Sequence, residues 1–181
     1  MIISELTLHN WQPYYGRGVN GLVIKLKGKS GENNSIFYGQ NTHGKSAIWQ
    51  AIQFAMYGRV NKRKTGWQDG KYKPYIADNT GAEPLLNLPA YEENDFVFAV
   101  NMKFNHDGDN YELDRSVEPR TGISKPKRDS ELLPTLTIKN LTKSIYIKSP
   151  QNFLNKILPE NLAQFFMFDG ERLNGYRDLF E

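Results

Sequence analysis

One glycine-rich stretch decides the fold, Gly39-Gln40-Asn41-Thr42-His43-Gly44-Lys45-Ser46, which fits the pattern G-x-x-x-x-G-K-[ST]. The two glycines of the pattern let the backbone wrap closely, so that successive N–H groups point inward at an anion. A helix that begins near Lys45 would add its positive N-terminal end at the same place. The stretch therefore predicts a phosphate-binding loop (P-loop) between a strand and a helix.

Both flanks of this loop carry the expected patterns. Residues 35–38 predict a short buried strand that runs directly into Gly39. From Lys45 onward the apolar residues follow helical spacing, and Gly58 supplies a stop after Ile48, Ala51, Ile52 and Ala55. A glycine-rich turn without a ligand is the alternative, but it gives no reason for lysine and serine at the last two positions of the pattern.

The loop predicts a site for ATP and Mg²⁺. Lys45 is expected to place its ammonium on the β- and γ-phosphates and is a candidate catalytic residue, while Ser46 would offer its hydroxyl to Mg²⁺. The candidate nucleotide-binding residues are Gly39, Gln40, Asn41, Thr42, His43, Gly44, Lys45, Ser46 and Ala47.

The rest of the chain predicts strands, hairpins and further helices. Strands are expected at 3–8, 22–27 and 96–104; the last turns at 106–110 and returns through 111–117. A second hairpin is expected from 136–138 and 144–147. A helix should begin at Ser149-Pro150 and end at Pro159, before a compact apolar run at 164–168. These elements predict an α/β fold: a mixed sheet with the P-loop at the end of a core strand and antiparallel hairpins to one side.

Composition narrows the class of protein. The 181 residues are enough for one domain with a buried core. Cysteine is absent, which excludes disulfides, a thiol nucleophile and a thiolate zinc site, and the three histidines are scattered. A formal net charge of +3 does not by itself indicate a nucleic-acid partner. We expect a cytoplasmic protein without a membrane partner, because the chain has no long apolar run and no leader-like N-terminus.

Three segments resemble SMC-like and double-strand-break-repair ATPases. The opening ISELTLHNWQPYYG (3–16) has a first strand that ends in an Asn-aromatic pair. The loop carries Asn41 two residues after its first glycine, and AIWQAIQFAMYG (47–58) is similar to the helix that follows the P-loop in that superfamily. ILPENLAQFFMFDGERL (157–173) resembles the DNA sulfur-modification ATPases (DndD) and related SMC-like phage-defence ATPases.

The resemblance implies the N-terminal lobe of an ABC-type ATPase head that a long coiled coil divides. Residues 1–168 would form the ATP-binding lobe, and 169–181 a Q-loop-like turn and the start of a helix that leads into the coiled coil. Asp169 falls at the Q-loop position, where it would contact Mg²⁺ or the attacking water as a second candidate catalytic and metal-binding residue.

The same resemblance implies partners and a role. The partners are a C-terminal lobe with the signature and Walker B motifs, a second ATPase head in a homodimer, DNA, and accessory defence subunits. ATP hydrolysis would be incomplete without the C-terminal lobe. ATP-dependent head dimerisation and hydrolysis would be coupled to DNA engagement, in phage defence or DNA sulfur modification.

Alternatives stay open at this stage. Residues 165–171 also fit a Walker B strand with Asp169 and Glu171 as its acids, which predicts a self-contained P-loop kinase or NTPase for a small molecule. A plain edge strand capped by Asp169, and a nucleotide-sensing module whose hydrolysis is irrelevant, are further hypotheses. The basic loop 59–75 either contacts a DNA backbone or is solvated surface; its cations and aromatics are Arg59, Lys62, Arg63, Lys64, Trp67, Lys71, Tyr72, Lys73 and Tyr75.

Overall fold

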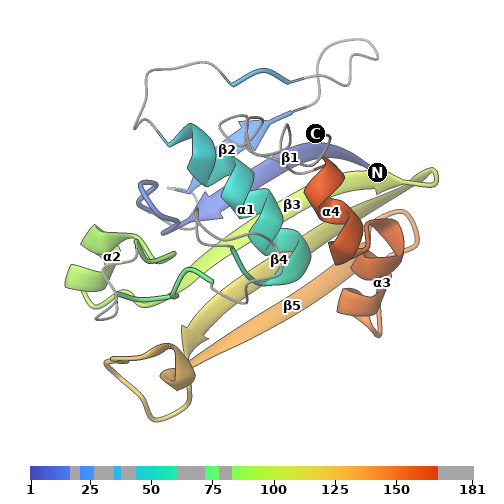
Figure 1. Ribbon diagram of the computed structural model, residues 1–181. Coiled ribbons are helices and arrows are strands. Elements are labelled where there is room, and N and C mark those ends of the chain that lie inside the picture. The colour runs from blue at the N-terminus through green and yellow to red at the C-terminus, as the bar shows by residue number, and fades with distance from the viewer. Residues whose placement is uncertain (17–20, 27–34, 38–43, 61–71, 78–82, 167–181) are drawn as a thin grey trace.

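A six-stranded sheet forms the centre of the computed structural model, which describes residues 1–16, 21–26, 35–37, 44–60, 72–77 and 83–166 (Figure 1). The strand order is β2-β1-β3-β4-β5-β6. The strands are β1 (Ile2–His9), β2 (Leu22–Lys25), β3 (Phe98–His106), β4 (Asp109–Pro119), β5 (Leu132–Asn140) and β6 (Ile145–Tyr146). The helices are α1 (Lys45–Tyr57), α2 (Leu88–Glu92), α3 (Pro150–Ile157) and α4 (Glu160–Phe166), with a 3-10 turn at Asp129–Glu131.

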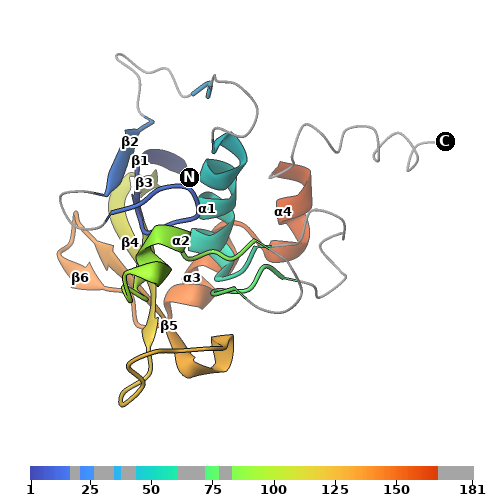
Figure 2. The same cartoon turned by 90° about the vertical axis from the view of Figure 1, so that its left-hand side faces the viewer.

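The molecule has two layers, because α1, α3 and α4 lie on the same face of the sheet (Figure 2). Side chains of a strand alternate between its faces, and in β3 every second residue (Phe98, Val100, Met102, Phe104) is buried beneath the helices. Phe54 of α1 is fully buried against the sheet. Burying an aromatic side chain of this size contributes about 2–3 kcal/mol. The α/β fold class is confirmed.

Two predicted elements are confirmed closely. Helix α1 ends where expected, because Gly58 takes a left-handed conformation (φ +73°) and donates its N–H to the carbonyl of Phe54 at 2.7 Å. The β3–β4 hairpin turns through Asp107 and Gly108, both with positive φ (+50° and +84°), as the tightest hairpin turns require. The second hairpin also forms, although β5 begins earlier than the sequence indicated, at Leu132.

The strand expected before the P-loop is absent from the described residues 35–37. Ile36 is 92% exposed and Phe37 41% exposed, so neither is buried, and Tyr38 lies outside the described residues. A short apolar run becomes a strand only where it pairs with another strand, and none of the strand pairings among the described residues includes residues 35–37. All five strand pairings are antiparallel in the part of the chain that the structure describes, where the sequence predicted a mixed sheet.

Helix α4 occupies the start of the apolar run at 164–168. Pro159 ends α3 as predicted, but its carbonyl then accepts from the N–H groups of Leu162 (3.0 Å) and Ala163 (3.1 Å) and starts a new helix. A Walker B strand or an edge strand is therefore wrong for residues 165 and 166, while 167 and 168 lie outside the described residues. Short apolar runs do not distinguish helix from strand. No helix in the described ranges is both long enough and apolar enough to cross a membrane.

Candidate nucleotide-binding site

The structure describes the last three residues of the predicted P-loop, Gly44 to Ser46, and Ala47 after them. Gly44, Lys45, Ser46 and Ala47 lie at the N-terminal end of α1. The remaining predicted positions lie outside the described residues: Gly39, Gln40, Asn41, Thr42, His43, Asp169 and Glu171. The helix start is therefore the described part of the predicted site.

Gly44 begins α1 in a left-handed conformation, with φ +81° and ψ +3°. Its carbonyl oxygen accepts from the N–H of Ala47 at 2.9 Å and of Ile48 at 3.2 Å, which closes the first turn. Lys45 and Ser46 follow, both half-buried. The first turn contains no acidic residue, and Gly44 provides no capping side chain. The positive end of the helix is therefore not neutralised from within α1 and is suited to an anion.

Three side chains from the turn after β1 hold this helix start in place. The Tyr14 hydroxyl donates to the carbonyl of Gly44 at 3.1 Å. The fully buried Trp11 donates from its indole Nε1 to the carbonyl of Ala47 at 2.9 Å. Gln12 Nε2 donates to Gln50 Oε1, one turn further along α1, at 2.7 Å. Sequence reasoning missed all three contacts, because no local pattern shows which loop packs beneath a helix start.

The same turn explains why residue 44 is glycine. A Cβ atom at that position would lie 2.5 Å from the Tyr14 hydroxyl oxygen and 3.2 Å from Cγ of Pro13. The left-handed conformation would also cost another residue about 1–2 kcal/mol. Space and backbone conformation both require glycine here, where the helix start lies against the turn after β1.

The supporting turn is itself held in an uncommon conformation. Asn10 and Gln12 both have positive φ, +43° and +47°. The fully buried Asn10 side chain donates from Nδ2 to Asp95 and to the carbonyl of Val97, each at 2.9 Å. Asn87 Nδ2 donates to the carbonyl of Gln12 at 2.6 Å. Such strained positions persist only where surrounding contacts determine them, and they cluster at functional sites.

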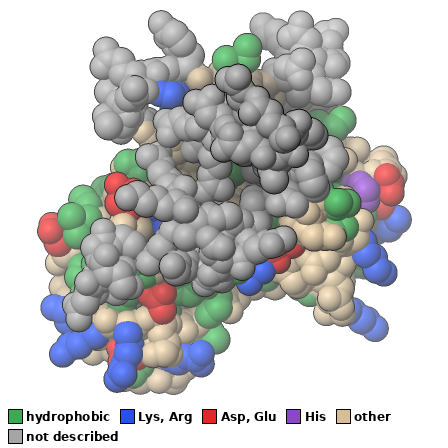
Figure 3. All heavy atoms as spheres, in the orientation of Figure 1, with side chains coloured by type: hydrophobic (Ala, Val, Ile, Leu, Met, Phe, Trp, Pro, Cys, Tyr) green, Lys and Arg blue, Asp and Glu red, His purple; other side chains and the backbone are tan. Residues whose placement is uncertain are grey.

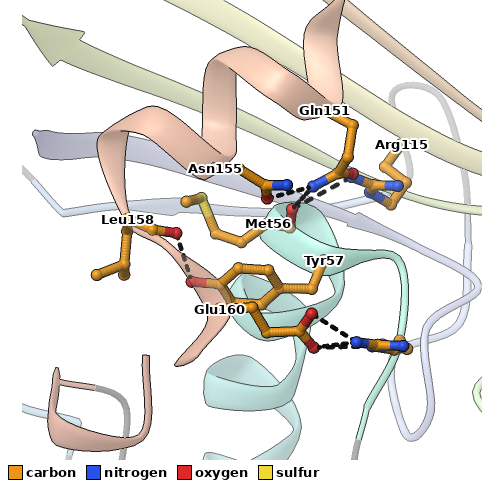
Figure 4. Close-up of polar contacts among 8 residues, drawn as sticks. Met56, Tyr57, Arg115, Gln151, Asn155, Leu158 and Glu160 are labelled. Atoms are coloured by element: carbon orange, nitrogen blue, oxygen red, sulfur yellow. Dashed lines mark hydrogen bonds and ion pairs between the residues drawn. The ribbon is translucent and has the colours of Figure 1, made fainter. Parts of the chain in front are cut away.

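The far end of α1 is tied to the segment that leads toward residue 169 (Figure 4). Gln151 of α3 donates from Nε2 to the carbonyl of Met56 at 3.0 Å. The Tyr57 hydroxyl donates to the carbonyl of Leu158 at 3.1 Å, and burial raises the pKa of Tyr57 to about 12, so it stays protonated. Arg59 forms a bidentate ion pair with Glu160, the first residue of α4. Helix α1 thus connects the predicted P-loop at one end to α4 at the other.

The described side chains of the basic loop 59–75 make contacts within the protein. Arg59 pairs with Glu160 and lies 4.6 Å from the ring centroid of Tyr72. The Lys73 ammonium is buried and lies 3.2 Å from Glu83. Tyr75 packs edge-on against Phe98. These contacts do not support a DNA-binding role for these four residues; the others of the loop lie outside the described residues.

The helix start fits a nucleotide triphosphate with Mg²⁺. Its positive end, a lysine and a serine hydroxyl on one turn, and a left-handed glycine at the helix start are groups suited to phosphate oxygens and the metal. Within the described ranges no cluster of three or more carboxylate or histidine side chains forms a separate metal site.

A glycine-capped helix start carrying lysine and serine, in an α/β fold, defines a P-loop nucleotide-binding domain. Comparison with protein families gives a match to the AAA domain over residues 5–180. Since the match covers nearly the whole chain, the chain belongs to this family of AAA domains, as the N-terminal lobe of an SMC-like ATPase. ATPases of this family generally use ATP with Mg²⁺. No curated protein matches the chain.

Proposed function

We propose that the chain is the ATP-binding lobe of an SMC-like ATPase head that couples ATP-dependent head dimerisation and hydrolysis to DNA engagement. The observation that carries the proposal is the start of α1, where Gly44 is held against Tyr14 and Lys45 and Ser46 form the first residues of the helix. The resemblance of residues 157–173 to the DNA sulfur-modification and phage-defence ATPases supports a role in one of those two processes.

In the proposed mechanism the chain binds and orients ATP rather than completing its hydrolysis. Lys45 would offset the negative charge of the β- and γ-phosphates, and the Ser46 hydroxyl would hold Mg²⁺, whose chemistry there would be to add positive charge at the phosphates. Asp169 is proposed to contact Mg²⁺ or the attacking water. The C-terminal lobe and a second head would supply the signature and Walker B groups.

The self-contained kinase or NTPase is not favoured, because residues 165 and 166 belong to α4 and not to a Walker B strand.

Binding of ATP and Mg²⁺ to the chain tests the proposal. Lys45→Ala is expected to abolish nucleotide binding measured by calorimetry, because the loop loses the ammonium that meets the β- and γ-phosphates. Lys125→Ala, an exposed lysine on the β4–β5 connection, is the matched control and should bind ATP as the unmodified chain does. Undiminished ATP affinity in Lys45→Ala would contradict the proposal.

Measuring ATP hydrolysis distinguishes an ATP-binding lobe from a complete enzyme. The isolated chain should bind ATP without appreciable hydrolysis, and a C-terminal lobe that carries the signature motif should restore turnover. In that assembled head, Asp169→Asn should leave ATP binding intact and slow hydrolysis. Robust hydrolysis by monomeric chain alone would support a self-contained NTPase instead.

A further inference from the structure

A shallow groove runs along α3 and the segment just before it. It encloses about 590 Å³ and is lined by Ile147, Lys148, Ser149, Asn152, Phe153, Asn155 and Lys156. Figure 3 shows basic side chains (Lys and Arg, blue) at the edge of the molecule where α3 lies. Every charged residue that lines the groove is a lysine, so the groove attracts anions.

The positive charge of the groove belongs to a segment without acids. From Leu132 to Pro159 the chain has four lysines and no aspartate or glutamate. The carboxylates around this segment already have cationic neighbours: Asp109 lies 2.6 Å from Lys143, and Glu160 is paired with Arg59. Among the described residues, no carboxylate lies within ion-pair distance of Lys148 or Lys156.

Neutral hydrogen-bonding groups lie between the two lysines. Asn152, Asn155 and Ser149 are exposed in the groove. Ser149 is the N-cap residue of α3, yet its hydroxyl makes no capping hydrogen bond and can donate to a ligand. Phosphate and sugar oxygens of nucleic acids are contacted by this mixture of lysine, hydroxyl and carboxamide groups.

The groove is held rigidly on the sheet. Leu154 is fully buried, and the ring of Phe153 lies 5.0 Å from the ring of Tyr111 on β4. Gln151 anchors the same helix to the carbonyl of Met56 on α1. Lys156 and the amides of α3 are therefore presented from a fixed helix, and Lys148 lies two residues before its first residue, Pro150.

We propose that the groove along α3 binds the sugar-phosphate backbone of DNA, with Lys148 and Lys156 each contacting a phosphate. The proposal rests on the proposed function in one respect, the engagement of DNA. It places the contact on α3, whereas the sequence directed attention to the basic loop 59–75, whose described cations are already paired.

A charge-matched pair of double variants tests the groove. Binding of a 30-base-pair duplex, and of one of its strands alone, is measured by fluorescence anisotropy between about 50 and 200 mM salt. Lys148→Ala/Lys156→Ala should weaken binding about ten-fold at 100 mM salt and reduce the slope of log affinity against log salt by about 2, since each phosphate contact contributes about 0.9 in a duplex. Lys125→Ala/Lys127→Ala removes the same charge from the exposed β4–β5 connection. This control pair should change neither the affinity for DNA nor the slope of log affinity against log salt.

Further variants and probes make each outcome decisive. Lys148→Arg/Lys156→Arg keeps the charge and should keep the affinity. Equal losses of DNA affinity in the two alanine pairs would show that only the net charge of the chain matters and would overturn the proposal. Absence of DNA binding by the unmodified chain would overturn it as well. Loss of binding to phosphatidylserine vesicles with DNA binding retained would assign the groove to a lipid surface instead.

ATP binding measured on the same proteins separates the two proposals. The α3 pair should bind ATP normally, and Lys45→Ala should keep its affinity for the duplex. Intact ATP binding in Lys45→Ala would contradict the proposed nucleotide site without contradicting the proposed DNA contact at the groove. Normal DNA binding by Lys148→Ala/Lys156→Ala would contradict the proposed DNA contact at the groove without contradicting the nucleotide site.

Discussion

Arg115 of β4 donates from Nε to the carbonyl of Ala55 at 3.0 Å, in the last turn of α1. Its Nη2 reaches the carbonyl of Met56 at 3.3 Å and Oε1 of Gln151 at 2.7 Å, so β4, α1 and α3 meet at one guanidinium (Figure 4). Burial lowers the pKa of Arg115 to about 10, which still leaves it charged at neutral pH. A cation is favoured at this end of a helix, where the last carbonyls are not satisfied within the helix.

Replacing Arg115 should destabilise the fold. Arg115→Met keeps much of the side-chain volume but removes three donated hydrogen bonds, and we expect a loss of about 1–3 kcal/mol because relief from burying a charge offsets part of the cost. Urea unfolding measures this loss as a change in the free energy of unfolding. Arg128→Met is the control: its side chain is 77% exposed, so the change should stay within about 0.5 kcal/mol. Equal midpoints for the two variants would contradict this role for Arg115.

Gly44→Ala should disturb the nucleotide site through Tyr14. The new methyl would meet the Tyr14 hydroxyl at 2.5 Å and occupy a left-handed conformation, so α1 must shift at its first turn. We expect at least a ten-fold loss of ATP affinity, measured by calorimetry. Tyr14→Phe removes the nearest atom of the clash and should recover part of that affinity in the double variant, while alone it loses one hydrogen bond, worth about 1 kcal/mol. Additive losses in the double variant would show that the clash is irrelevant.

The sequence predicted α1 and the hairpins because their signals are local. The helical spacing from Ile48 to Ala55 and the stop at Gly58 lie within one element, and the turn at Asp107-Gly108 needs only its own two residues. The predicted P-loop helix therefore agrees with the structure at both ends.

The errors have non-local causes. Residues 35–37 and 165–166 are short apolar runs whose conformation depends on what lies beside them: no described strand pairs with the first run, and the Pro159 carbonyl begins a helix at the second. The contacts of Tyr14 with Gly44 and of Trp11 with Ala47 join segments 30 or more positions apart. No periodicity in a single sequence reveals such pairs.

Acid should weaken the contact of Asp109 with the turn after β5. Hydrogen bonds from Lys143 and then Asn140 hold the pKa of Asp109 below its ordinary value. The folded state therefore binds this proton less readily than the unfolded chain, so the stabilisation is complete above about pH 4 and is lost as the pH falls through the lowered pKa. Asp109→Asn should be less stable than the unmodified chain near pH 6, and the difference should shrink toward pH 2.

Urea midpoints at about pH 2, 4 and 6 measure that convergence. Asp107→Asn is the control on the same hairpin, since the Asp107 side chain is 87% exposed and asparagine also tolerates a positive φ. A stability difference for Asp109→Asn that stays constant with pH would exclude the ion pair as its source.

Arg59 and Glu160 should control the order of α4 more than the stability of the whole fold. Arg59 Nε donates to Glu160 Oε1 at 2.8 Å, and both side chains are partly exposed (42% and 33%), so breaking the pair should cost at most about 1 kcal/mol overall. Helix α4 spans only Glu160–Phe166, and so short a helix depends on such tertiary contacts. In Arg59→Ala, amide hydrogen exchange should accelerate in α4 while α1 remains protected.

The charge-reversed pair decides whether the ion pair itself is responsible. Arg59→Glu/Glu160→Arg should restore slow exchange in α4, whereas either reversal alone should not. Arg128→Ala, which breaks the exposed pair with Glu131, should leave α4 unchanged. Because α4 leads toward Asp169, a loosened α4 should slow hydrolysis in an assembled head while ATP affinity stays the same. Faster exchange in α4 with full turnover would show that hydrolysis does not depend on this contact.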